Sequence, residues 1–423
     1  MNQISEPGSS SQFTAHNSQL PWLRHGRALV AGRGSDALLR FGLFLATARV
    51  LEPRDYAIYV LLTAALATSQ WAVSLGAPRA ALYFHARGVR GPLFGWLYAL
   101  AGAGSAAVIG LATVLPPLRR AFFPQVPLGL LLLGLAPLPF SLLADSVSLT
   151  LVAGGRHRAY AATLWTRNLG TALVLATSLL VPHRLLWILA GRLAVNAVTA
   201  AAVAVVARAR PDWAGARAFA PEALRYAAPA GLSDAVLSLH RRADVFLLSA
   251  FGRTSELGPY GLAYAFAEAF WVVTDSLEWA FFVDSAKLDP LRARAAVRRA
   301  LSVYALAGLG GLVLGYGAGR LALSLFFEAR YPGAISLLPW LLAAAVAWGL
   351  ARPFTSFFLS QGQVATAVRC QLAGLFLNLL FCAAWIPAYG AAGAAVACLA
   401  SYAAEALLFA VVFWMKGTAP STS

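Results

Sequence analysis

The sequence predicts an all-α polytopic membrane protein of about 12 transmembrane helices, arranged as two six-helix halves. Of its 423 residues, 60% are hydrophobic and only 12% are charged, and the charged share is about half that of a typical soluble domain. Apolar stretches of about 20 residues follow one another almost end to end. A short run near the first of them, Ser35 to Leu39, recurs as Ser233 to Leu237 near the seventh.

Taken in order, the apolar stretches predict a domain plan with short loops. A polar tail (1–26) precedes an N-lobe of six helices (27–207), a basic linker (208–224), a C-lobe of six helices (225–414) and a second tail (415–423). The predicted spans cover about 27–50, 56–79, 91–115, 127–150, 159–181, 184–207, 225–250, 259–283, 300–325, 333–357, 364–386 and 390–414.

Basic residues predict the orientation of the chain. If the N-terminus is cytoplasmic, the cytoplasmic segments contain 18 Lys and Arg residues and the opposite side contains 7. Such an excess marks the cytoplasmic face, so both termini are expected in the cytoplasm. The net charge of +16 therefore indicates a lipid bilayer as partner and no nucleic acid.

Charged residues recur at helical spacing inside two predicted spans, one early in each half. Residues three, four or seven apart share one face of a helix. An ionised side chain at membrane depth costs roughly 2.5–3.5 kcal/mol, so it normally faces a bundle interior or a watery cavity. The pattern predicts a polar path for an anionic substrate. The stripes are Arg33, Asp36 and Arg40 in the first span, and Asp234, Arg241 and Asp244 in the seventh.

Arginine is the residue expected to bind such a substrate, because it stays charged in apolar surroundings and pairs bidentately with phosphate. The alternative is structural pairing inside the membrane, of Arg33 or Arg40 with Asp36 and of Arg241 with Asp244. Positive charges outnumber acids on the two faces, which favours substrate contact. The substrate-binding candidates are Arg33, Arg40, Arg241, Arg242 and Arg352.

Acidic residues within the spans suggest a second role, because carboxylates at membrane depth are common parts of proton or sodium coupling. Glu268, Asp275 and Glu278 form a stripe on the eighth span. Equally, these acids would neutralise the arginines of the first and seventh spans. The ion-coupling candidates are Asp36, Asp244, Glu268 and Asp275.

The remaining charges carry weaker signals. Arg167, Arg192, Asp145 and Glu405 lie nearer the ends of their spans, where snorkelling to the interface accounts for most such residues. His240 could titrate near neutrality, but a single histidine is more often a packing residue. No nucleotide loop, metal-ligand cluster or nucleophile motif is present, so we expect a transporter without cofactor or metal, and no enzyme.

Several motifs resemble one known family. The run from Arg49 to Tyr56 resembles the signature that opens polysaccharide flippases, although Glu52 and Ala57 stand where glycine is usual. The second half opens similarly, and the end of the chain is similar to that family's last two spans. The family is the O-antigen and exopolysaccharide flippases of the multidrug/oligosaccharidyl-lipid/polysaccharide exporter superfamily. The later motifs are Pro229, Asp244, Gly258 to Tyr260, Ala263, Gln361 to Gln363, Asn378, Ile386-Pro387 and Gly390 to Ala397.

This resemblance implies a V-shaped bundle of two lobes that opens alternately to each side. It implies a cargo of undecaprenyl-diphosphate-linked oligosaccharide, moved from the cytoplasmic to the periplasmic leaflet of a bacterial inner membrane for polysaccharide biosynthesis, with cationic residues receiving the diphosphate. Partners would include a proton or sodium ion and the polysaccharide polymerase and export machinery. Two alternatives remain: a drug/cation antiporter of the same superfamily, and a membrane glycosyltransferase or polymerase, against which the short outer loops argue.

The orientation is directly testable. Single cysteines at Ser10 and Ser421 should resist an impermeant thiol reagent in intact cells, because both tails are expected in the cytoplasm. A cysteine at Ser255, in a loop expected outside, should react. Labelling of either tail from outside would contradict the predicted topology.

Overall fold

The computed structural model describes residues 36, 38–286 and 288–418, and these ranges are almost entirely helical. After a helical stretch at 38–50, the helices are α2 (Pro53–Ser74), α3 (Ala77–Ala86), α4 (Gly91–Val114), α5 (Pro116–Phe122), α6 (Leu128–Leu135), α7 (Leu138–Ala153), α8 (His157–Ser178), α9 (Arg184–Ala207), α10 (Trp213–His240), α11 (Ala243–Ala250), the 3-10 turn η1 (Thr254–Glu256), α12 (Leu257–Ser285), α13 (Pro290–Phe326), α14 (Ala334–Ser360) and α15 (Val364–Thr418).

The predicted all-α membrane fold is confirmed, and the predicted spans fall mainly on helix where they are described, although some are interrupted, as at 56–79 after Ser74 and at 225–250 after His240. Seven stretches, single helices or joined ones, are long and apolar enough among the described residues to cross a membrane. Helices α8, α10 and α12 are not among these seven. The last two predicted spans form one element, α15, which breaks at Gly390 (φ 56°). The Glu256 carboxylate accepts the Ala391 N–H at 2.6 Å beside this break.

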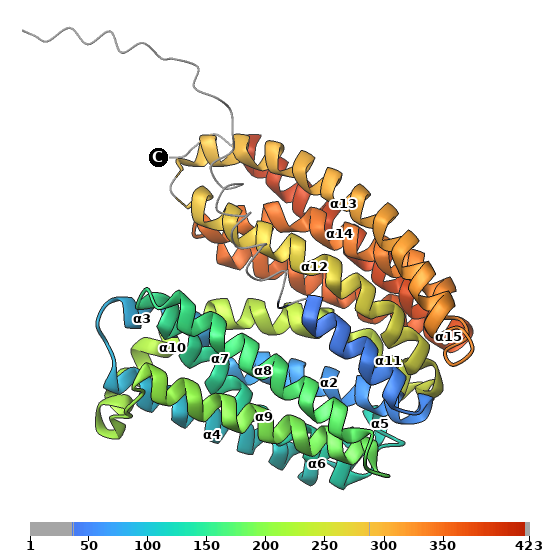
Figure 1. The fold of residues 1–423 in the computed structure, drawn as a ribbon. Coiled ribbons are helices and arrows are strands. Elements are labelled where there is room, and N and C mark those ends of the chain that lie inside the picture. Colours follow the sequence, from blue (N-terminus) through green and yellow to red (C-terminus); the bar gives the residue numbers. More distant parts are fainter. Residues whose placement is uncertain (1–35, 37, 287, 419–423) are drawn as a thin grey trace, which may run out of the picture.

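Two helical lobes face each other (Figure 1). Helices α2–α9 form the N-lobe and α12–α15 form the C-lobe. The lobes approach at the end where α2 and α12 begin, which we call the closed end. They diverge towards the end where α3 ends and α13 begins, which we call the open end.

Polar contacts join the lobes at the closed end. The Tyr331 hydroxyl donates to the Ala48 carbonyl at 2.7 Å, and Arg49 Nη1 donates to the Phe326 carbonyl at 3.0 Å. The rings of Tyr56 and Tyr331 meet edge to face, 5.4 Å apart. Burial raises the pKa of Tyr331 to about 12, so its hydroxyl keeps the proton that it donates at neutral pH.

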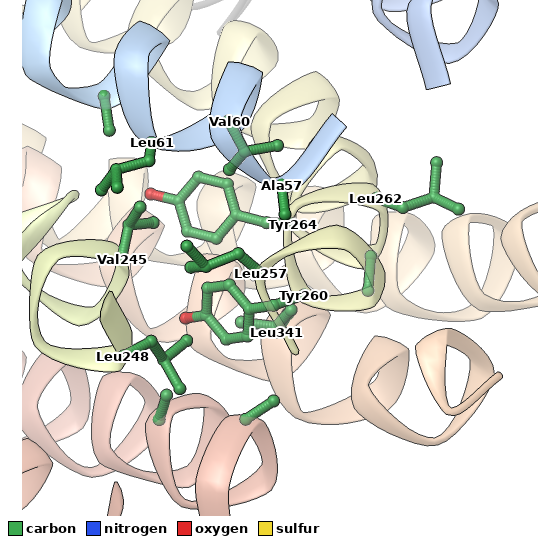
Figure 2. Close-up of a cluster of buried hydrophobic side chains, with 14 of the residues drawn as sticks. Ala57, Val60, Leu61, Val245, Leu248, Leu257, Tyr260, Leu262, Tyr264 and Leu341 are labelled. Atoms are coloured by element: carbon green, nitrogen blue, oxygen red, sulfur yellow. The ribbon is translucent and has the colours of Figure 1, made fainter. Parts of the chain in front are cut away.

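Apolar packing extends this junction into the bundle. The rings of Tyr260 and Tyr264 on α12 lie among side chains of α2 and α11 (Figure 2). Val60 and Leu61 approach from α2, and Leu248 from α11; all three are buried. Between helices in a bilayer, close van der Waals packing replaces the hydrophobic effect as the source of stabilisation, so the closed end is held by an apolar core as well as by hydrogen bonds.

Helix α10 links the lobes at the open end. The Asp212 side chain caps it by accepting the Gly215 N–H at 3.0 Å, which is the usual role of aspartate at a helix N-terminus. The Asp212 N–H also donates to the Gly91 carbonyl at the start of α4. Further along, the Tyr83 and Tyr226 rings stack 4.0 Å apart. Much of the predicted 208–224 linker is therefore helix docked on the N-lobe.

A glycine permits the closest approach of α10 to the N-lobe. A Cβ atom at Gly231 would lie 2.3 Å from both the Gly76 nitrogen and the Leu75 carbonyl carbon. These are backbone atoms, so they cannot rotate away as a flexible side chain would. Because Gly231 has no side chain, α10 can pack directly on the backbone of the N-lobe here and cross towards the C-lobe.

We expect Gly231→Ala to destabilise the protein by about 1–3 kcal/mol, because the added methyl group overpacks a backbone contact. Gly317→Ala is the matched control, since nothing lies within 4 Å of its would-be Cβ and alanine favours helix by up to about 1 kcal/mol. Thermal unfolding of both variants in detergent measures the difference. Equal unfolding temperatures would contradict the close approach.

Candidate functional site

A cavity of about 350 Å³ lies between the lobes, a volume typical of small-molecule sites. Its wall comes from the 38–50 helix, α2, α7, α8 and α9 on one side, and from the α10–α11 junction, α11 and α12 on the other. The wall mixes apolar side chains with an unusual number of charges. The charged and amide residues in it are Arg40, Arg167, Arg192, Arg242, Asp145, Glu268, Gln70, Asn168 and Asn196.

Two of the four arginines are paired with acids of the N-lobe. Arg40 Nη2 lies 2.6 Å from an Asp36 oxygen, and Asp36 also accepts from the Asn168 amide at 2.7 Å. Arg167 Nη1 lies 2.8 Å from Asp145. The Arg40 side chain is 53% exposed, so its remaining N–H groups are available to a bound anion.

The third arginine is paired across two helices. Arg242, at the junction of α10 and α11, forms an ion pair with Glu268 on α12 and lies 5.1 Å above the Tyr264 ring. Both members of the pair line the cavity and are partly exposed. A cation or an anion that enters the cavity therefore meets both charges of this pair.

The fourth arginine, Arg192 on α9, has no ion pair with any acid among the described residues. It still lines the cavity. Because an unpaired guanidinium in a partly apolar wall is costly, this position favours a negatively charged ligand.

Two predicted arginines, Arg241 and Arg352, lie away from the cavity wall. Arg241 pairs with Asp275 at 2.9 and 3.1 Å and lies over the Trp348 ring. The Arg352 side chain is 1% exposed and lies 3.4 Å from Glu405. The predicted alternative pairing of Arg241 with Asp244 is wrong. The helix breaks after His240, so the two residues do not share a continuous helix face.

Asp244 is fully buried with three hydrogen-bond donors around it. Its oxygens accept from the Val245 N–H at 2.8 Å, the Cys398 thiol at 3.1 Å and the Tyr260 hydroxyl. These donors satisfy the hydrogen-bonding needs of its buried oxygens. Its ion-coupling role stays a prediction.

The sequence analysis identified some of the residues at this cavity and missed others. Arg40, Asp36, Arg242 and Glu268 come together at the cavity, whereas Arg33 lies outside the described residues. Sequence reasoning placed Arg167, Arg192 and Asp145 near the membrane interface, whereas the structure places all three at the cavity wall, on α8, α9 and α7. The spacing of Arg192, Asn196 and Thr199, which share a helix face, was the signal that could have found it.

Among the described residues, no group of His, Cys, Asp and Glu side chains is arranged to hold a metal ion. The three cysteines, Cys370, Cys382 and Cys398, are buried and free.

No family model matches the chain, and no curated protein matches it. Solved structures do. It is similar to an inward-facing multidrug-resistance MATE family transporter of the MOP superfamily (TM-score 0.71, 12% identity, 92% of this chain and 96% of the other). It is also similar to a MOP superfamily transporter from Pyrococcus furiosus whose binding pocket has reversed polarity (TM-score 0.66, 13% identity, 93% and 95%).

A third similar structure is the lipid II flippase MurJ in an inward closed conformation (TM-score 0.61, 11% identity, 92% of this chain and 87% of the other). The chain therefore has the fold that MOP superfamily transporters and this lipid flippase share. At these identities the likeness shows the fold, and the cargo has to be argued from the cavity.

The Arg242–Glu268 pair predicts a measurable coupling. Arg242→Gln or Glu268→Gln alone should destabilise the protein by about 1–3 kcal/mol, because each leaves a partly buried charge without its partner. The double variant should recover part of that loss, and thermal unfolding of all four proteins gives the coupling energy. Strictly additive effects would mean that the two charges do not interact.

Proposed function

We propose that the protein is a flippase that moves undecaprenyl-diphosphate-linked oligosaccharide across a bacterial inner membrane by alternating access. The observation that carries this proposal is the cavity between the lobes, whose wall holds four arginines and two carboxylates, with Arg192 unpaired among the residues that the structure describes. Arginine forks match the geometry of diphosphate oxygens. The cavity would enclose the diphosphate and the nearest sugar.

The arrangement of the lobes supports alternating access. The lobes are joined by hydrogen bonds and an apolar core at the closed end and diverge at the open end (Figure 1). A carrier of this kind exposes its site to one side at a time. With the predicted topology, the open end faces the cytoplasm, where the lipid-linked precursor would enter.

An exchange of partners provides a route to ion coupling. Glu268 pairs with Arg242 at the cavity wall, so a proton or cation on Glu268 would release the arginine to the diphosphate. After the lipid leaves, the pair would form again and expel the ion. Asp36 with Arg40 offers a second pair of the same kind. Thermodynamic linkage then requires that the ion and the lipid each change the affinity of the other.

The alternative of a drug/cation antiporter is favoured by the likeness to MATE transporters. A cationic drug needs an acidic or aromatic wall, and four arginines around the cavity oppose it. The two functions separate experimentally by the charge of the cargo.

The test is flipping of a fluorescent polyprenyl-diphosphate disaccharide in reconstituted vesicles. Arg192→Gln should slow flipping about tenfold or more, because hydrogen bonds to a charged group are worth about 1.5–3 kcal/mol. Arg192→Lys should recover part of the rate, since a point charge replaces the fork.

Arg320→Gln is the matched control, because Arg320 lies exposed on α13, away from the cavity. Its flipping rate should equal that of the wild type. Transport of a cationic dye in place of the lipid, or full lipid flipping by the Arg192→Gln variant, would overturn the proposed cargo.

A further inference from the structure

The C-lobe contains a fully buried histidine–carboxylate pair that the proposed cargo site does not use. His240 Nδ1 on α10 lies 3.1 Å from Glu405 Oε2 on α15, and both side chains are 0% exposed. Neither ring nitrogen of His240 nor Oε2 of Glu405 makes a well-formed hydrogen bond to any described residue. Buried polar atoms are normally satisfied, so the facing Nδ1 and Oε2 atoms form a place for one proton.

The walls of this pair leave no room for a larger ligand. The His240 ring meets the Tyr402 ring at 4.8 Å and the Trp348 ring at 5.7 Å. On the other side Glu405 packs against Gly374, where a Cβ atom would come within 2.7 Å of its Oε2 oxygen. The chemistry that fits the site is proton binding.

Carboxylates outnumber guanidinium groups around the His240–Glu405 pair. Arg352 on α14 lies 3.4 Å from Glu405 and 4.0 Å from Glu278 on α12. Arg241 on α10 pairs with Asp275 on α12. Arg241 is therefore matched one to one, whereas Arg352 faces two carboxylates, so one negative charge is left over beside Arg352 when both are ionised. One proton on His240 balances it.

Other charged groups near α10 are already matched. Arg79 on α3 pairs with Asp234, and Arg242 pairs with Glu268. Asp244 takes three hydrogen bonds of its own. The thiol of Cys370 and the hydroxyl of Tyr402 also face the region from α15, and both are neutral over the range in which histidine titrates. Glu278, 21% exposed, connects the cluster to solvent.

His240 also lies at the break between α10 and α11. It is the last residue of α10, and the chain breaks at Arg241 and Arg242 before α11 begins. The first half of α10 packs on the N-lobe, whereas Ser233 and His240 contact Gln371 and Glu405 on α15 of the C-lobe. A bond at His240 therefore holds the broken end of the helix to the C-lobe.

From this geometry we infer that His240 and Glu405 form a proton-binding site that controls the break between α10 and α11. With the proton bound, histidinium pairs with Glu405 and fastens the end of α10 to α15, as in the arrangement described. When the proton leaves to solvent, Glu405 keeps Arg352 alone and the end of α10 is released. The inference rests on the proposed transport function only in assigning this movement to the transport cycle.

The first measurement follows the proton directly. NMR of protein labelled with ¹⁵N-histidine, with the His240 signal assigned from its loss in His240→Gln, should show this ring binding and releasing a proton as the pH is varied. Glu405→Gln should alter that behaviour, because it removes the carboxylate that shares the proton. A His240 signal that does not change with pH, or that is indifferent to Glu405→Gln, would overturn the site.

The second measurement follows the lobes. Spin labels at Ala86 and Leu291, exposed on α3 and α13 at the open end, report their separation in a background with the native cysteines replaced by serine. Acid should populate the wide separation and alkali should deplete it. The His240→Gln and Glu405→Gln variants should lose this response, and His183→Gln, an exposed histidine, should keep it.

A pH response retained in both cluster variants would overturn the inference, as would its loss in the His183 control alone. The two proposals fail separately. If the wild type does not flip the diphosphate lipid but its lobes still respond to pH through His240 and Glu405, the cargo is wrong and the proton site stands. If lipid is flipped and neither residue alters the response, the cargo stands and the proton site is wrong.

Discussion

Burying an ionised side chain in an apolar bundle is expensive, and the structure depends on how its arginines meet that cost. Arg40, Arg167, Arg241 and Arg242 each face an acid, and two of these four pairs connect the end of α10 to α12. Removing one partner of such a pair is worse than removing both. The pairs therefore fix which helices are neighbours. They also present charged groups that a bound ligand can contact in place of the paired residue.

The two ends of the molecule use different forces. At the closed end, Tyr331 and Arg49 bond to backbone carbonyls across the lobes, and aromatic rings fill the space behind them. At the open end, the N-lobe is reached by α10, packed tightly through Gly231. A junction of directional hydrogen bonds opens or closes as a unit, whereas a helix crossing through glycine can pivot. This asymmetry suits a protein whose lobes separate at one end.

Sequence reasoning reached the fold, because apolar length and loop charge are properties of the chain itself. It also found Arg40 with Asp36, since four residues along a helix place two side chains together. It failed where pairing depends on tertiary contacts or on a broken helix. Arg241 was matched with Asp244 by spacing alone, but the break after His240 turns it to Asp275. Arg192 looked like a residue near a span end because its position was weighed without the polar helix face that it shares with Asn196 and Thr199.

The break between α10 and α11 explains how distant groups can act together. Three consecutive residues, His240, Arg241 and Arg242, reach Glu405, Asp275 and Glu268 in turn. Because the helix ends at His240 and resumes only at Ala243, these three side chains can point to α15, to α12 and to the cavity at once. A shift of this segment moves all three contacts together. Binding of an anion by Arg242 and of a proton by His240 then act on the same few residues of backbone, which is the physical requirement for coupling between two sites.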